Sequence, residues 1–336
     1  MADSSTSNVR TSSGDRATKL TGRAILLRLL YSLFSLIFIS FITFMADEIA
    51  PGDAATIRAG DKVTAEQVQR IRREMGLDRP WPIRYVEFMG NAARFDFGVS
   101  AVGIQEPINK KLAATIPVTM RIAVLAILLA SIVGITLGTI AAIRENRAAD
   151  RAILSLSTLG VTIPNYVLLP VLVYLFAVQW DQLPATWQPD GRRVAGDIYY
   201  LIIPVVVLSL RPMATLTRLM RASMVDTLGQ EYVRLAVAKG VPRIQLYFKH
   251  CLRNAIIPVL TAIGTSFGYL LTGSFVVENA YTIPGIGRET ITAITQRDTP
   301  MILAATLVTG AMFVAVNLIV DLLLPLIDPR IRESQV

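Results

Sequence analysis

Residue types that usually carry chemistry are scarce in this chain of 336 residues. It has one histidine and one cysteine, His250 and Cys251, and they are adjacent. Neighbours on a helix point about 100° apart, so these two cannot by themselves form a nucleophile and its base. The sequence contains no GxxxxGK[ST] phosphate-binding loop and no HExxH zinc motif. We therefore expect no catalytic residue, no metal site and no cofactor on this chain, and an intramembrane enzyme is a poor interpretation.

Three polar residues inside apolar blocks are candidates to line a translocation pathway: Arg211, Glu278 and Asn317. Ionisable groups at membrane depth are costly, so they mark function by default. Arg211 lies about twelve residues, or roughly 18 Å, into its block. Either it faces a cavity, a partner subunit or a carboxylate, or the span ends early and Arg211 extends to the inner interface. No carboxylate pair stands at an obvious spacing, which argues against a proton-driven pump.

Six apolar blocks must position these residues. The chain is 53% hydrophobic, with a mean hydropathy of +0.51. Each block reaches the roughly 20 residues that cross a bilayer, and together they span 24–46, 118–143, 152–179, 199–221, 256–279 and 301–327. The first apolar run is longer than that of a secretory signal, so we expect a retained span. The fold class predicted is an all-α membrane protein with six transmembrane helices.

The charge pattern predicts how these spans are oriented. Lysine and arginine gather in the short flanks, and with six spans these flanks fall on one side, which the positive-inside rule places in the cytoplasm. The net charge of +8 lies mostly beside apolar blocks, which fits lipid contact and not nucleic-acid binding. The predicted organisation is a disordered cytoplasmic N-terminus (1–22), a first transmembrane helix (23–46), an extracytoplasmic segment (47–117), a core of five transmembrane helices (118–330) with a cytoplasmic loop (221–258), and a tail (331–336).

Shorter patterns add local predictions. Thr64 to Met75 is expected to form a helix with Thr64 as N-cap and Gly76 just past its end. This outer segment is either a small cap over the outer mouth or a docking surface for an extracytoplasmic partner. The pairs Gly134/Gly138 and Gly264/Gly268 have small-xxx-small spacing and predict close helix packing.

The polar segment Gln230 to Pro258 is too basic for lipid and too strongly patterned for a slack loop. Gly240 suits a helix stop, and Pro242 suits the first turn of a second helix. We expect one apolar face with Val233 and Val237, and an apolar stripe along Ile244, Phe248 and Cys251/Leu252. Such a segment either lies on the lipid surface or enters a groove on a soluble motor subunit.

The string EYVRLAVAKG followed by HCLRNAIIP resembles the cytoplasmic EAA-type loop of ABC importer permeases, in the version of the oligopeptide/dipeptide/nickel family. Other stretches resemble this family in the same order: APGD (50–53), GLDRPWPIRY (76–85), DFGVS (96–100), IPNY (163–166), VVENAYTIPGIGRETITAITQRDTP (276–300) and DPRIR (328–332). The residues assigned to ATPase coupling are Glu231, Tyr232, Arg234, Ala236, Ala238, Lys239, Gly240, Pro242, His250, Arg253, Asn254 and Pro258. The long outer segment favours the B-type subunit.

The resemblance implies a type I ABC importer permease fold in the inner (plasma) membrane of a prokaryote. The implied partners are a homologous permease, two cytoplasmic ABC ATPase subunits that carry ATP and Mg, an extracytoplasmic solute-binding protein and the lipid bilayer. Oligopeptides or dipeptides are the expected cargo, and nickel chelates, glutathione and sugars stay open. The alternative is a secondary transporter or channel without an ATPase, which predicts dense ionisable pairs at the midplane.

Three residues depart from the resemblance. Arg234 stands where more general EAA loops carry glutamate, although arginine is usual in this family. Phe95 precedes Asp96 where the family usually has glycine, which affects an outer turn. Arg211 is atypical for the fourth span.

Overall fold

The computed structural model describes residues 12–49, 55–56, 64–74, 76–102, 106–188 and 198–327. In these ranges the regular elements are helices, joined by turns and irregular segments, with one isolated bridge between Val99 and Pro107. The main helices are α1 (Ser12–Ile49), α3 (Ala65–Glu74), α4 (Trp81–Ala92), α5 (Ile108–Ile143), α6 (Ala148–Thr162), α7 (Asn165–Val173), α8 (Ile198–Leu228), α9 (Glu231–Ala238), α10 (Arg243–Gln245), α11 (Leu252–Ala280), α12 (Ile286–Gln296) and α13 (Thr299–Ile327). The predicted all-α membrane fold is confirmed.

Five helices are long and apolar enough to cross a membrane, and a bent pair makes up to six. The third predicted span, 152–179, is this pair: α6 and the segment Asn165–Gln179 meet at 101°. Ile163 at the junction is extended because the ring of Pro164 disfavours helical geometry in the residue before it. Pro164 also has no N–H to continue the helical ladder.

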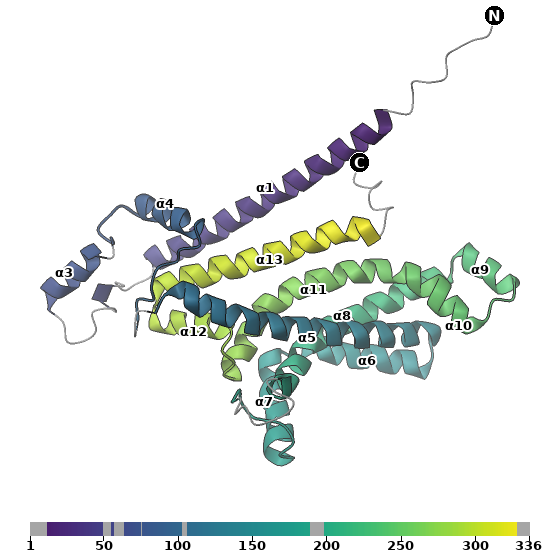
Figure 1. Cartoon of the computed structure of the whole chain (residues 1–336). Coiled ribbons are helices and arrows are strands. Elements are labelled where there is room, and N and C mark those ends of the chain that lie inside the picture. The colour runs from purple at the N-terminus through teal and green to yellow at the C-terminus, as the bar shows by residue number, and fades with distance from the viewer. Residues whose placement is uncertain are drawn as a thin grey trace, which may run out of the picture.

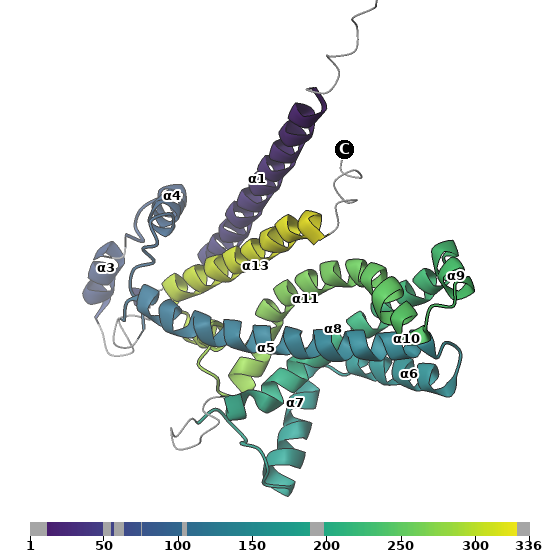
Figure 2. The ribbon, with the colours of Figure 1, turned by 45° about the vertical axis from the view of Figure 1, so that its right-hand side comes forward.

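Helix α1 starts before the predicted span. The expectation of disorder over 1–22 is wrong from Ser12 onward, where the backbone is helical, and residues 1–11 lie outside the described part. No proline interrupts residues 12–28, so the apolar span continues a helix already begun. Figures 1 and 2 show α1 leaning away from the bundle, with α13 beside it.

The centre of the bundle is formed by α5, α8 and α11, and glycines let these helices approach. A Cβ added at Gly138 would lie 2.6 Å from the carbonyl oxygen of Thr217 on α8. A Cβ added at Gly264 would lie 2.3 Å from Val320 on α13. The predicted close packing at both glycine pairs is confirmed.

The outer segment carries the predicted helix as α3. Gln67 Oε1 accepts a hydrogen bond from the backbone N–H of Thr64 at 3.2 Å, which closes the start of the helix. Gly76 adopts a φ of 68° at its end. The sequence analysis did not predict α4, or the start of α5 at Ile108. Figure 1 shows α3, α4 and α12 at one end of the bundle, and α9 and α10 at the opposite end.

Candidate functional site

The predicted hairpin forms, and it projects from the ends of α8 and α11 (Figure 1). Helix α9 stops in a Schellman motif: Gly240 N–H donates to the Val237 carbonyl at 2.9 Å, and Val241 N–H donates to the Ala236 carbonyl at 3.2 Å. Gly240 has a φ of 77°, a conformation that favours glycine. The predicted break is confirmed, and it fixes the direction of the chain between the two helices.

The restart differs in detail from the expectation. Pro242 stands at the N-cap of α10, one position before the first turn, and its carbonyl accepts a hydrogen bond from Leu246 N–H at 2.9 Å. After α10, the six residues Leu246–Cys251 form a π-helical turn that runs directly into α11. Such wider turns place an extra residue in the helix and recur at functional sites.

The π turn changes which apolar residues face inward. Leu246 and Cys251 are buried, together with Val233 of α9, and they pack against Met220 and Met224 at the end of α8. These contacts anchor the hairpin on α8. The side chain of Cys251 is fully buried, which fits its expected structural role.

The exposed side of the hairpin carries apolar side chains that the predicted faces did not place there. Ile244 is 75% exposed and Phe248 is 60% exposed, whereas the expected stripe joined them to buried Cys251. Val237 is also exposed, although it was expected to share a face with Val233. The extra residue in the π turn rotates Phe248 away from the Leu246–Cys251 side, so the hairpin has one buried face and one exposed apolar face.

A hydrogen bond joins the two halves of the hairpin motif. Asn254 Nδ2 donates to Tyr232 Oη at 2.7 Å, so the EYVR and LRNA strings meet in space. Of the other residues assigned to coupling, two are half-buried, Ala236 and His250. The rest are exposed: Glu231, Arg234, Ala238, Lys239, Gly240, Pro242, Arg253 and Pro258. The structure therefore brings the assigned set together on one small unit.

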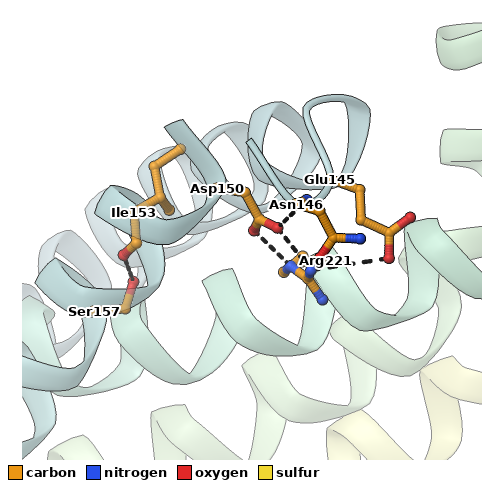
Figure 3. A network of polar contacts seen from close by, with 6 residues as sticks. All are labelled: Glu145, Asn146, Asp150, Ile153, Ser157 and Arg221. Atoms are coloured by element: carbon orange, nitrogen blue, oxygen red, sulfur yellow. Dashed lines mark hydrogen bonds and ion pairs between the residues drawn. The ribbon is translucent and has the colours of Figure 1, made fainter. Parts of the chain in front are cut away.

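An ion pair that the sequence analysis missed lies just before the hairpin. Figure 3 shows that Arg221 of α8 donates two parallel hydrogen bonds, 2.6 and 2.7 Å long, to the carboxylate of Asp150 of α6. Asp150 is buried and also accepts the backbone N–H of Asn146 at 2.9 Å, while Glu145 lies 4.0 Å from Arg221. An acid in the first turn of α6 and an arginine near the end of α8 were the only sequence signals. The pair fastens the α5–α6 loop to the helix that carries the hairpin.

Glu278 was predicted to line a pathway, and the structure gives its carboxylate structural contacts within the chain. Its side chain is fully buried. Oε1 accepts hydrogen bonds from the hydroxyls of Thr119 and Ser274, each at 2.8 Å. Oε2 accepts the backbone N–H groups of Gly287 at 2.8 Å and Arg288 at 3.4 Å, which are orphan donors at the start of α12. The carboxylate therefore caps α12 and ties it to α5 and α11.

The glycines before and in α12 make room for this carboxylate. A Cβ at Gly285 would lie 2.3 Å from Glu278 Oε2, and one at Gly287 would lie 2.8 Å from it. Thr119 Oγ1 accepts the Ile286 N–H at 3.0 Å, so a third backbone donor of α12 is satisfied. The PGIG string is therefore a packing requirement of the capped helix.

Outer motifs that are distant in sequence meet beside α12. Buried Asp298, just before α13, accepts hydrogen bonds from the Ser100 hydroxyl and from Ala101 N–H at 3.0 Å. Thr299 donates to Asp47 of α1 at 2.8 Å. These contacts hold the DFGVS string against the core. Nearby, Phe95 has a φ of 57°, the left-handed region, which explains why glycine suits this position.

Beyond the end of α11, Tyr281 lies at the end of the core that is next to α12. Its hydroxyl donates to the Pro184 carbonyl, and its own carbonyl accepts Trp187 N–H at 3.0 Å. Burial raises the pKa of the Tyr281 phenol, so it stays a neutral donor.

The remaining pathway candidates differ in exposure. Arg211 is exposed on α8, and its Nη1 donates to Tyr269 Oη of α11 at 2.9 Å. Asn317 is half-buried on α13, its Nδ2 donates to the Phe313 carbonyl at 2.9 Å, and it stands against Gly268. This arrangement fits packing for Asn317 and leaves Arg211 as the accessible candidate.

A string inside α11 has the letter spacing of a catalytic motif. The letters Gly264 to Gly268 match the GxSxG spacing of a nucleophile elbow, but they lie inside the continuous helix α11, not at a strand-to-helix turn. In the described ranges, no three His, Cys, Asp or Glu side chains come together as a metal site.

Comparison with known proteins supplies the family. Residues 134–333 match the model of the binding-protein-dependent transport system inner membrane component, and residues 22–123 match the N-terminal model of such membrane components. A probable peptide ABC transporter permease protein of Sinorhizobium fredii is 36% identical over 93% of this chain and 99% of its own length. The dipeptide transport system permease protein DppB of Bacillus subtilis is 36% identical over 89% of this chain and 94% of its own length. A putative peptide transport system permease protein of Brucella abortus is 35% identical, covering 92% and 98%. The chain belongs to the family of binding-protein-dependent transport system inner membrane components.

Proposed function

We propose that the chain is the permease subunit of an ABC transporter that imports peptides, and that the hairpin 230–258 is its ATPase-coupling element. The observation that carries the proposal is the hairpin itself. It is anchored on α8 by Val233, Leu246 and Cys251, yet its outer face exposes Ile244 and Phe248.

The position of the hairpin favours a soluble partner over the lipid surface. Helix α8 has 31 residues and is therefore about 46 Å long, whereas the apolar core of a bilayer is about 30 Å thick. Its last turns extend beyond the membrane, and α9 and α10 lie at that far end (Figure 2). Exposed apolar side chains away from lipid are typical of a protein-binding surface. Five basic residues surround them, against one acidic residue, Glu231.

The partners follow from this assignment. A homologous permease completes the membrane unit, and two ABC ATPases, which carry ATP and Mg, bind the hairpins on the cytoplasmic side. Both termini lie on that side as well, in the inner membrane of a prokaryote. A solute-binding protein docks at the opposite end, where α3, α4 and α12 lie (Figure 1). Peptides are the cargo by analogy with the relatives named as peptide and dipeptide permeases.

The contacts at the base of the hairpin allow it to move as one rigid unit and to pass this movement to the helices of the bundle. Closure of the ATPases on ATP moves the hairpin, which is held as one unit by the Schellman stop and by the bond between Asn254 and Tyr232. The pair of Arg221 and Asp150 transmits that movement from α8 to α6. A permease with inward- and outward-facing states then changes its population with the nucleotide of its partner.

The test is to purify the chain with the second permease and the ATPases encoded beside it. Phe248→Glu places a charge on the docking face, and we expect the ATPases to be lost during purification. Gly240→Val forces a branched residue into a left-handed conformation, which costs about 1–2 kcal/mol and displaces the hairpin. We therefore expect peptide-stimulated ATP hydrolysis to fall about tenfold.

Phe95→Glu is the matched control, because Phe95 is also an exposed phenylalanine and lies at the opposite end of the bundle. It should leave the ATPases bound. Intact assembly with unchanged peptide-stimulated ATP hydrolysis in both hairpin variants would reject the coupling role.

A further inference from the structure

Three arginines on α8 differ in how their charge is balanced. Arg221 is held by the buried carboxylate of Asp150 (Figure 3). Arg211 donates only to the neutral phenol of Tyr269, with its guanidinium 5.0 Å from the ring centre. Arg218, seven residues on and therefore on the same face, makes no hydrogen bond or ion pair with the described residues. Among the residues that the structure describes, two of these three positive charges have no anion partner.

Arg211 lies near the middle of the membrane. It is thirteen residues after the start of α8 and seventeen before its end, so the helix does not stop early as one alternative required. Arg221 marks the inner end of the bundle through its contact with the α5–α6 loop, and Arg211 lies about 15 Å deeper. Lipid phosphates at the surface of a bilayer core about 30 Å thick are out of reach of this side chain.

The face around Arg211 is polar, in contrast to the face that meets lipid. Next to it, α8 exposes Thr215, and α11 exposes Thr265 and Thr272 on either side of Tyr269. The exposed residues in the middle of α5, Val124, Leu128 and Ile132, are instead apolar, and Arg121 and Thr136 flank them. An unbalanced charge at this depth must face water, a partner or a ligand. The face between α8 and α11 is therefore the one that lines the route of the cargo.

We propose that Arg211, assisted by Arg218, forms an anion site that binds the C-terminal carboxylate of the peptide cargo as it passes between the two permease subunits. This rests on the proposed function. A guanidinium offers two parallel donors to a carboxylate, and such charge-assisted bonds strengthen where water is excluded. The acids of α8 and α11 are not competitors: Asp226 lies fifteen residues beyond Arg211, and Glu278 is fully engaged at α12.

Arg218 lies toward the hairpin, about 10 Å from Arg211 along the helix. The carboxylate released by Arg211 therefore meets a second cation on its way inward. Two weak sites in series let an anion enter and leave, whereas one deep site would retain it.

The experiment uses the complete transporter in liposomes, with its binding protein and a tripeptide either as the free acid or as the C-terminal amide. ATP-driven uptake gives an acid-to-amide ratio for wild type, Arg211→Gln and Arg211→Lys. The preference of the binding protein is the same in every case, so it cancels between variants. We expect the acid-to-amide uptake ratio to fall about tenfold in Arg211→Gln, because this variant loses a charge-assisted hydrogen bond to the carboxylate. The ratio should fall less in Arg211→Lys, which keeps the positive charge. Arg147→Gln, which removes an exposed arginine of the α5–α6 loop, should leave it unchanged.

A second readout does not require the amide to be a cargo. With saturating loaded binding protein, maximal uptake of the free acid should fall about tenfold in Arg211→Gln, with less loss in Arg211→Lys. An unchanged ratio and unchanged maximal uptake would overturn the proposal while leaving the transporter intact. Loss of the second permease from the Arg211→Gln complex, or an effect that follows the anionic lipid content of the liposomes, would also overturn it. Wild type that takes up no peptide at all would instead reject the proposed function.

Discussion

Glu278 and Arg211 look alike as sequence, since each is an isolated charge in an apolar span, but the structure separates them. Glu278 is fully buried and accepts four hydrogen bonds that bind α5, α11 and the start of α12. Arg211 is exposed and has one neutral partner. The carboxylate of Glu278 is therefore satisfied by donors of its own chain and supports the fold. Arg211 has no anion among the described residues, which is why we assign it a partner from outside the chain.

This difference gives a rule for charges in membrane helices. Burying a charge is costly, and at Glu278 this cost is offset by hydrogen-bond donors from the same chain. A charge in a membrane helix that has no such partners in its own chain is destabilising there. Its presence is then explained by a ligand or by a partner subunit that it contacts.

Replacing Glu278 gives the largest expected effect. Glu278→Ala leaves buried hydroxyls and N–H groups without an acceptor, and we expect a loss of about 3 kcal/mol in the free energy of unfolding. Glu278→Gln keeps one acceptor and should lose less than half of that. Thermal unfolding of the purified complex in detergent measures both. If Glu278→Ala were as stable as wild type while altering cargo preference, the two charges would not differ in the way described.

Removing one partner of the Asp150–Arg221 pair should give an intermediate effect. Asp150→Leu strands a guanidinium that is about one-fifth exposed, so we expect a loss of about 2 kcal/mol. The double variant Asp150→Leu with Arg221→Leu should recover part of it, because replacing both partners removes the unpaired charge. The same unfolding assay applies, and a double variant less stable than either single one would contradict the charge-pair account.

Removing Arg211 should have the smallest effect on stability. Arg211→Leu leaves no buried group without a partner, since Tyr269 is itself partly exposed. We expect the free energy of unfolding to change by less than about 0.5 kcal/mol, as for other surface substitutions. A loss comparable to that of Glu278→Ala would mean that Arg211 also supports the fold.

Local signals in the sequence predicted the spans and the hairpin well. Gly240 stopped α9 and Gly76 stopped α3 because both need a left-handed backbone that other residues adopt at a cost. The exposed face of Phe248 could not be predicted, because a π turn arises from the packing of Leu246 and Cys251 and not from a residue pattern. The role of Glu278 depends on the chain returning nine residues later, and the contact of Arg221 with Asp150 joins residues 71 apart. Such long-range contacts leave no periodic trace in a single sequence.

The most direct measurement is peptide uptake into liposomes that contain this chain, the second permease and the ATPases, with the binding protein and an energy source supplied separately. The account predicts uptake only when ATP and the binding protein are both present, and none from a proton or sodium gradient alone. Uptake driven by an ion gradient without the ATPases would contradict it and would favour a secondary transporter.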